Sequence, residues 1–148
     1  MNKIVPLQML KDLKGKTVLA HGCFDLIHPG HLEHLKQAKQ MGDILIVTIT
    51  ADKFVNKGPN RPQFNEFQRA EHLASLEMVD YVAIIKEPTA LMAIETIHPA
   101  IYCKGSEYET KEDPVFLKEK QAVKRYGGKV AFTHGFVASS SHLINSTQ

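Results

Sequence analysis

The sequence predicts a doubly wound, Rossmann-like α/β fold, in which a five-stranded parallel sheet carries helices on both faces. Short apolar runs bounded by Gly, Asp or Pro alternate with segments of helical period, which is the pattern of repeated βαβ units. The runs are almost continuously apolar, as in strands that are buried on both faces. The chain has 148 residues, 43% of them hydrophobic, which suits one well-buried domain over residues 1–148.

Each apolar run of strand length is followed by a segment with apolar residues at helical spacing. The runs place strands at Thr17–His21, Asp43–Ile49, Tyr81–Ile85, Ala100–Cys103 and Lys129–Phe132. Helices are expected at Gly30–Met41, Asn65–Leu76, Pro88–Ile97 and Pro114–Tyr126, with a last one starting near Ser139. In the second helix, the residues expected to face inward are Phe67, Ala70, Leu73 and Ala74. Because the last helix leaves barely two turns before Gln148, we expect a domain cut from a longer protein.

Composition disfavours several classes of function. Charged residues make up 23% of the chain and the formal net charge is +2, without the basic excess of a nucleic-acid-binding protein. The longest apolar stretches, such as Ile44–Thr50, are far shorter than a membrane span. Cys23 and Cys103 form no C-x-x-C pair, which fits a reduced compartment. We therefore expect a cytoplasmic protein with no nucleic-acid partner and no membrane contact, whose anionic ligand is small.

The segment His28-Pro-Gly-His31 follows a buried strand and opens a helix. Ligands of open parallel sheets bind at this place, beyond the carboxyl ends of the strands. The N–H groups of a first helical turn form an anion site, and Gly30 lets a phosphate approach the backbone closely. His28 and His31 can point to one side of the turn. Imidazole donors there would stabilise the charge that builds on an α-phosphate during displacement.

His28 and His31 also admit other interpretations. Helix capping or a surface position is the plain alternative for both histidines. Zinc binding by His28, His31 and His34 is disfavoured, because residues 28 and 34 are nearly opposed on a helix and no H-E-x-x-H pattern joins them. We therefore assign no metal ligand. Gly15-Lys-Thr17 is not a P-loop, since Leu10 stands where the first glycine belongs, and no G-x-G-x-x-G follows a strand, which disfavours a nicotinamide cofactor.

The decapeptide Gly22-Cys-Phe-Asp-Leu-Ile-His-Pro-Gly-His31 resembles the signature of the cytidylyltransferase-like nucleotidyltransferases, which carry H-x-G-H at the first strand-to-helix turn. Further matching segments follow in the family's order: Lys57-Gly-Pro-Asn-Arg-Pro62, Gln68-Arg69, Val79-Asp-Tyr-Val82, Lys104-Gly-Ser-Glu-Tyr108 and Ser139-Ser-Ser-His-Leu-Ile144. Within the family, the chain is most similar to the nucleotidyltransferase domain of bifunctional ADP-heptose synthases and related sugar-kinase fusions, and more distantly to glycerol-3-phosphate cytidylyltransferase. Ser106 and Glu107 depart from the Lys-Gly-Gly-Asp-Tyr expected there, at the contacts to base and ribose.

The resemblance implies a set of site residues. Catalytic roles fall on His28, His31, Lys57 and Arg69. Nucleotide contacts fall on Cys23, Phe24, Asp25, Gly30, Lys104, Gly105, Glu107, Ser139, Ser140 and Ser141. Substrate contacts fall on Asp25, Asp52 and Arg61. The plain alternatives are a solvated lysine at position 57, a surface salt bridge at position 69 and a helix cap among the serines.

The implied reaction transfers a nucleoside monophosphate from an NTP to a small phosphorylated substrate and releases pyrophosphate, with Mg²⁺ accompanying the NTP. ATP and a sugar phosphate such as a heptose 1-phosphate are favoured. The alternatives are a CTP-dependent enzyme acting on glycerol 3-phosphate or another polyol or sugar phosphate, adenylylation of a vitamin-like phosphate such as a flavin or pantetheine phosphate, and a nucleotide-binding module without turnover. We also expect a homodimer, and a sugar kinase on the same chain or on a separate one.

Overall fold

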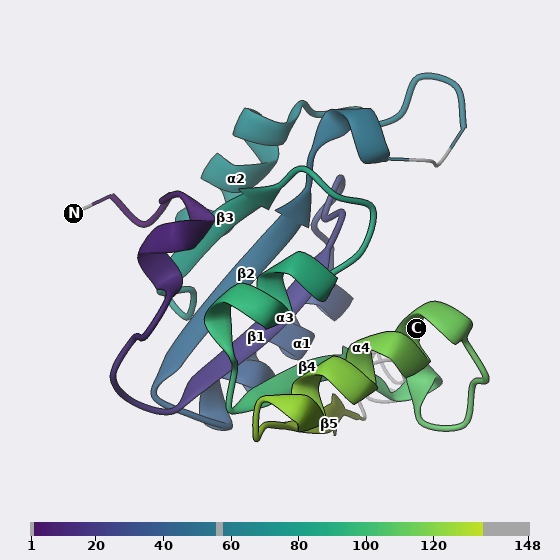
Figure 1. The fold of residues 1–148 in the computed structure, drawn as a ribbon. Coiled ribbons are helices and arrows are strands. Elements are labelled where there is room, and N and C mark those ends of the chain that lie inside the picture. Colours follow the sequence, from purple (N-terminus) through teal and green to yellow (C-terminus); the bar gives the residue numbers. More distant parts are fainter. Residues whose placement is uncertain (1, 56–57, 135–148) are drawn as a thin grey trace, which may run out of the picture.

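A parallel sheet runs through the middle of the molecule in the computed structural model, which describes residues 2–55 and 58–134 (Figure 1). Its five strands are β1 (Thr17–Gly22), β2 (Ile44–Thr50), β3 (Tyr81–Ile85), β4 (Ile101–Gly105) and β5 (Lys129–Thr133). They stand in the order β3-β2-β1-β4-β5, and every neighbouring pair is parallel. The predicted five-stranded, doubly wound sheet is confirmed.

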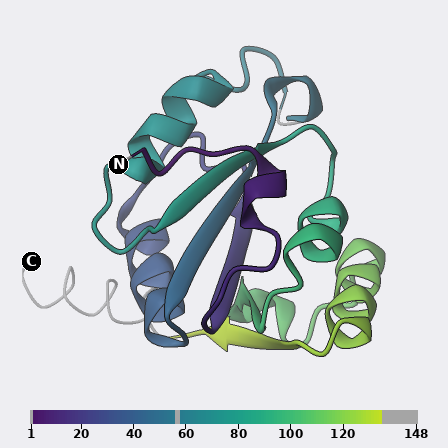
Figure 2. The ribbon, with the colours of Figure 1, turned by 60° about the vertical axis from the view of Figure 1, so that its left-hand side comes forward.

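Helices cover both faces of the sheet. They are α1 (Pro29–Gln40), α2 (Glu66–Ala74), α3 (Leu91–Ile97) and α4 (Pro114–Arg125). The chain also forms three short 3-10 helices, η1 (Leu7–Leu10), η2 (Asp52–Phe54) and η3 (Ser106–Tyr108). α1 and α2 lie on one face, whereas α3, α4 and η1 lie on the other (Figure 2). The helix predicted from Ser139 lies outside the described residues. Within residues 2–55 and 58–134, no helix has the length and apolar character needed to cross a membrane.

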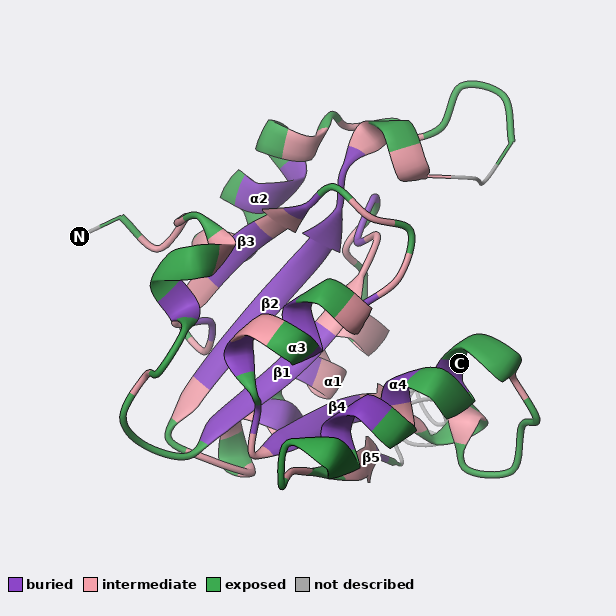
Figure 3. Ribbon diagram, in the orientation of Figure 1, coloured by how far each residue is buried: buried purple, intermediate pink, exposed green. Residues whose placement is uncertain are grey.

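Two hydrophobic cores form because successive side chains of a strand point to opposite faces of the sheet. Val18 and Val47 pack toward α1 and α2, whereas Leu19 and Ile46 pack toward α3 and α4. Figure 3 shows the central strands buried along most of their length, under helices that are exposed only on their outer sides. Since both faces are covered, we expect a ligand to reach this sheet at the strand ends.

Phe67 corrects one expectation about α2. Its side chain was expected to face inward, but it is 67% exposed. The buried residues of the helix are Arg69, Ala70 and Leu73. At 100° per residue, Phe67 stands about 60° beyond Ala70, on the side away from Leu73. An inward-facing arginine has therefore turned the buried stripe of the helix away from Phe67.

The carboxyl ends of β1 and β4 diverge. β1 pairs with β2 along its whole length, but it pairs with β4 only at Val18 and Leu19. The order of the strands also reverses between β1 and β4. Open α/β sheets bind their ligands in the crevice outside the strand ends at such a reversal. α1 begins at this edge, immediately after the turn that leaves β1.

Candidate active site

The first turn of α1 brings the two predicted imidazoles together. His28 is the N-cap residue of α1, and its Nδ1 accepts a hydrogen bond of 3.0 Å from the amide of Gly30. His31 Nδ1 accepts a hydrogen bond of 3.2 Å from the amide of His28, which completes a capping box. The two ring centroids are 3.9 Å apart. The pair is therefore set by the backbone of the helix start itself.

These hydrogen bonds also select the tautomer of both rings. An Nδ1 that accepts a hydrogen bond carries no proton, so in the neutral ring the proton lies on Nε2. Nε2 is then the donor nitrogen of each ring, at a helix start whose N–H groups and dipole favour an anion. The capping role of His28 and the predicted phosphate role consequently use different nitrogens of the same ring.

Phe24 packs against the first turn of α1. Its φ of 51° lies in the left-handed region, which residues other than glycine seldom adopt. The Phe24 ring is 7% exposed and meets the His31 ring edge-on, with centroids 5.4 Å apart. Such a backbone conformation persists only where the surrounding packing holds it. The buried ring of Phe24 therefore helps to fix the position of His31.

Arg69 is fully buried and joins four chain segments. Its guanidinium donates to Cys23 O at 3.0 Å, Thr50 O at 2.7 Å, Phe64 O at 3.0 Å and Asp52 Oδ1 at 2.7 Å. These acceptors lie just beyond β1, at the end of β2 and at both ends of the loop that follows β2. A phosphate contact would require Arg69 to share or give up one of these bonds. The geometry thus gives Arg69 a structural role, which is to join these four segments by hydrogen bonds. Its predicted catalytic role stays a prediction.

Asp25 ties the far end of the same loop to the turn after β1. Its carboxylate accepts hydrogen bonds from the amides of Gln63 (2.8 Å) and Phe64 (2.9 Å) and from Arg61 Nη1 (3.1 Å). Burial alone would raise the pKa of Asp25, but the two amides and the Arg61 guanidinium outweigh it and lower that pKa below the ordinary 3.8. The structure therefore brings Asp25 and Arg61 together, and both oxygens of the carboxylate are already engaged.

Three further predicted residues meet at the end of β4. The Lys104 ammonium lies 4.1 Å from the centre of the Tyr108 ring and 5.6 Å from that of Tyr102. Burial lowers the pKa of Lys104, and nearby carboxylates oppose that shift. A Cβ on Gly105 would stand 2.9 Å from the Glu107 carboxylate, so the glycine leaves room for that side chain. Lys104, Gly105 and Glu107 thus form one local cluster at the carboxyl edge of the sheet.

Two half-buried histidines near this edge, His21 and His34, make contacts that the sequence did not predict. His21 Nδ1 lies 2.8 Å from Thr48 Oγ1, and burial together with Lys104 lowers the pKa of His21 to about 4. His34 Nδ1 lies 2.7 Å from Thr133 Oγ1, and burial together with Lys104 also lowers the pKa of His34. Both rings are therefore neutral at pH 7. No local motif marks them, because each contact joins different strands or a helix and a distant strand.

The remaining predicted phosphate ligands are Lys57, Ser139, Ser140 and Ser141, and all four lie outside the described residues. Their contacts stay predictions. Among residues 2–55 and 58–134, no three His, Cys, Asp or Glu side chains gather closely enough to hold a metal ion.

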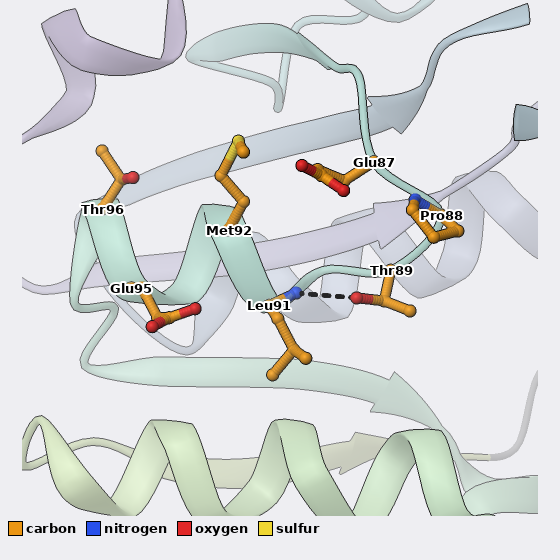
Figure 4. Close-up of a pocket in the computed structure, with 7 residues that line it drawn as sticks. All are labelled: Glu87, Pro88, Thr89, Leu91, Met92, Glu95 and Thr96. Carbon is orange, nitrogen blue, oxygen red and sulfur yellow. Dashed lines mark hydrogen bonds between the residues drawn. The ribbon is translucent and has the colours of Figure 1, made fainter. Parts of the chain in front are cut away.

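An apolar hollow of about 360 Å³ lies beside the His28 turn, between α1 and α2. It is lined by Asp25, Leu26, Ile27, Leu32, Phe64, His72, Ser75 and Leu76. A second hollow, of about 430 Å³, is formed by α3 and the loop before it (Figure 4). The charged residues that line the second hollow are Glu87 and Glu95, which would repel a triphosphate. The α1 start is therefore the better place for a nucleotide.

A sequence profile of cytidylyltransferase-like proteins matches residues 19–141. The chain belongs to the cytidylyltransferase-like family. The bifunctional protein HldE of Geobacter metallireducens is 43% identical to this cytidylyltransferase-like domain, over 78% of this chain and 23% of its own length. The bifunctional protein HldE of Campylobacter fetus is 41% identical, over 97% of this chain and 31% of its own length. The chain therefore spans less than a third of these relatives. Together the matches confirm the resemblance and indicate a nucleotidyltransferase enzyme.

Solved structures agree with this fold. A lipopolysaccharide core biosynthesis protein from Thermoplasma volcanium superposes with a TM-score of 0.69 at 26% identity, over 82% of this cytidylyltransferase-like chain and 98% of its own. The pantoate-beta-alanine ligase of Francisella tularensis superposes with a TM-score of 0.61 at 19% identity, over 90% of this chain and 67% of its own. The second comparison concerns the fold alone.

Replacing Arg69 by lysine tests whether the hydrogen bonds of this side chain stabilise the fold. Arg69→Lys keeps the charge, but one ammonium cannot span acceptors on four segments, so buried carbonyls lose their donor. We expect the free energy of unfolding to fall by about 3 kcal/mol, measured by urea denaturation. Arg125→Lys, at the exposed end of α4, is the matched control and should change little. If the free energy of unfolding fell no more for Arg69→Lys than for the control, the structural role of Arg69 would be contradicted.

Asp25 should make stability depend on pH in the acid range. A carboxyl whose pKa is lowered by folding stabilises the protein above its unfolded pKa, and this contribution disappears as the pH falls through the folded pKa. Between pH 7 and about pH 4 we expect Asp25→Asn to be less stable than the unsubstituted protein, and the gap to close at lower pH. Urea unfolding at a series of pH values measures it, with Asp12→Asn on the exposed surface as control. Parallel curves down to pH 2 would refute the assignment.

Proposed function

We propose that this domain transfers a nucleoside monophosphate from an NTP to a sugar phosphate and releases pyrophosphate, with ATP as the favoured donor. One observation carries the proposal: the rings of His28 and His31 lie with centroids 3.9 Å apart at the N-terminus of α1, and each accepts a backbone hydrogen bond at Nδ1, which assigns the donor proton to Nε2. Donors held in a fixed position where charge develops stabilise a transition state more than a ground state. A helix start beyond a parallel strand adds the backbone N–H groups that a phosphate needs.

In this proposal, a phosphate oxygen of the acceptor attacks the α-phosphorus in line. The new bond joins the acceptor oxygen to the α-phosphorus, and the bond to the bridging oxygen breaks, so that pyrophosphate leaves with the electron pair. The acceptor phosphate is largely ionised near neutral pH and needs no strong base, so catalysis rests on positioning and on charge stabilisation. His28 and His31 donate to the α-phosphate and the bridging oxygen. Lys57 and the serines Ser139, Ser140 and Ser141 receive the β- and γ-phosphates.

A Mg²⁺ ion bound to the triphosphate would reduce the charge repulsion between its phosphates. The Asp25 carboxylate is buried and has both oxygens engaged. The side chain of Asp52 is 39% exposed, and only one of its oxygens is bound to Arg69. Asp52 therefore fits an ion, or a water molecule on that ion, better than Asp25 does. Because Mg²⁺ usually keeps several water and phosphate ligands, one such carboxylate suffices.

The choice of acceptor and donor rests on similarity. The resemblance to the bifunctional ADP-heptose synthases supports ATP and a heptose phosphate, and it supports a sugar kinase that acts before this domain on the same or a separate chain. The likeness to a lipopolysaccharide core biosynthesis protein points the same way. CTP remains the alternative donor.

A second candidate acceptor follows from the apolar hollow beside the His28 turn. Its lining of Leu26, Ile27, Leu32 and Phe64 suits an acceptor with an apolar portion. A vitamin-like phosphate such as pantetheine phosphate has this character. The catalytic residues would be the same, so the acceptor alone separates the two candidates.

A matrix of donors and acceptors tests the proposal. The protein is incubated with Mg²⁺, one NTP at a time, and heptose 1-phosphate, glycerol 3-phosphate or pantetheine phosphate, and pyrophosphate release is measured. We expect release with ATP and the heptose phosphate. Release with CTP alone would replace the donor, and release with pantetheine phosphate alone would replace the acceptor. No release with any pair would leave a binding module without turnover and refute the proposed function.

His31→Ala tests the role of the imidazole pair. Removing one transition-state donor should lower kcat by a factor of about 100 or more, because His28 Nε2 cannot cover both phosphate positions. Steady-state kinetics measures kcat, and a thermal melt checks that the variant is folded. His98→Asn, at the left-handed C-cap of α3, is the control and should keep its kcat. Near-normal kcat in a folded His31→Ala protein would remove His31 from the mechanism.

A further inference from the structure

Glu119 is a buried carboxylate of α4, and both of its oxygens are engaged. The residue is only 4% exposed. Its Oε1 accepts a hydrogen bond of 2.9 Å from the Tyr102 hydroxyl, and its Oε2 accepts one of 3.0 Å from the Ala90 amide. Burial, together with Glu119, raises the pKa of Tyr102 well above its ordinary 10.0. The hydroxyl therefore keeps its proton and remains the donor to Glu119.

Lys104 lies close to Glu119, but its ammonium rests on aromatic rings. It stands 4.1 Å from the centroid of the Tyr108 ring and 5.6 Å from that of Tyr102. Burial lowers the pKa of Lys104, and of the carboxylates that oppose this shift Glu119 has the largest effect. Within residues 2–55 and 58–134, Glu119 nevertheless forms no ion pair. A half-buried cation and a buried anion thus influence each other without direct contact.

The Lys104 ammonium has donors to offer a ligand at the edge of the sheet. In the part of the chain that the structure describes, it contacts ring faces and makes no hydrogen bond, although an ammonium has three N–H donors. Burial, and then the charge of Lys104, lower the pKa of His21 on β1 and of His34 on α1. The ammonium therefore lies where the ends of β1 and β4 diverge, near the helix that begins with the imidazole pair.

We propose that Tyr102 is a positioning residue for nucleotide binding: its hydroxyl occupies Glu119 and its ring supports Lys104, so that the ammonium binds an anionic group of the nucleotide and not Glu119. The inference rests on the proposed function and on the nucleotide contact that the resemblance implies for Lys104. Without the hydroxyl, Glu119 Oε1 would lose its donor, and a buried carboxylate that lacks a partner is costly. Lys104 would then pair with Glu119 and be withdrawn from the ligand.

Tyr102→Phe should weaken nucleotide binding, because it keeps the ring but allows Lys104 to pair with Glu119. We expect the Kd for MgATP, or for MgCTP if that is the donor, to rise about tenfold in isothermal titration calorimetry, as for the loss of one charge-assisted hydrogen bond. The KM for the acceptor should be nearly unchanged. Tyr126→Phe removes a hydroxyl from the exposed C-cap of α4 and should keep the original Kd.

A second substitution separates this role from a general loss of stability. When Glu119→Gln is added to Tyr102→Phe, position 119 has no charge to attract Lys104, so the Kd should return close to that of the unsubstituted protein. A site that was merely destabilised would bind more weakly still. An unchanged Kd in Tyr102→Phe, or no recovery in the double variant, would overturn the positioning role while the proposed function stands.

The pKa of Lys104 gives a measurement that needs no nucleotide. NMR titration of its ammonium should show a higher pKa in Tyr102→Phe, where the ion pair forms, and a lower one in the double variant. Asp113 and Glu107, which also raise this pKa, are the same in all three proteins. An unchanged pKa in Tyr102→Phe would overturn the inference alone. An unsubstituted protein that binds neither MgATP nor MgCTP would refute the inference and the proposed function together.

Discussion

The buried guanidinium of Arg69 is the interaction on which the site depends. A charge removed from water is tolerated only when hydrogen bonds and an opposite charge surround it, and here Cys23 O, Thr50 O, Phe64 O and Asp52 surround this one. If the ends of β1 and β2 separated, the buried guanidinium would lose its hydrogen bond to Cys23 O or to Thr50 O. The buried, negatively charged carboxylate of Asp25 also joins two segments. It accepts hydrogen bonds from the amides of Gln63 and Phe64, at the end of the loop that follows β2. Two buried charges, on Arg69 and Asp25, thus fix the segments that follow β1 and β2 beside the start of α1.

In the proposed mechanism, the His28 ring at the start of α1 combines a structural role with a chemical one. His28 Nδ1 caps the helix and thereby leaves the proton of the neutral ring on Nε2. A side chain whose rotamer is locked by the backbone meets a substrate with little loss of entropy, which is what positional catalysis needs. The sequence offered capping and phosphate binding as alternatives for His28. The two are compatible, because capping uses Nδ1 and leaves Nε2 as the donor nitrogen that the proposed phosphate contact needs.

The parts of this structure that could be predicted are those with a local cause. Continuous apolar runs predicted the strands, and the H-x-G-H turn identified the imidazole pair, because each depends on residues close together in sequence. The burial of Arg69 could not be predicted, since an arginine on an amphipathic helix ordinarily faces water. The two hydrogen bonds between the Gln37 side chain and the His134 main chain join residues 97 apart in the sequence. No pattern in one sequence marks such a pair. Phe67 was misplaced for a related reason, because the stripe of α2 is organised around the unexpected arginine.

The central position of β1 has a consequence for the chain as it is being made. β1 finds one neighbour, β2, soon after it leaves the ribosome, but the other, β4, begins only at Ile101. Until then a three-stranded unit of β1, β2 and β3 leaves the backbone of Val18 and Leu19, which pairs with β4 in the finished protein, without that partner. An open apolar edge of this kind pairs readily with other chains. A chain that ends before β4 should therefore be more prone to aggregation than the complete domain.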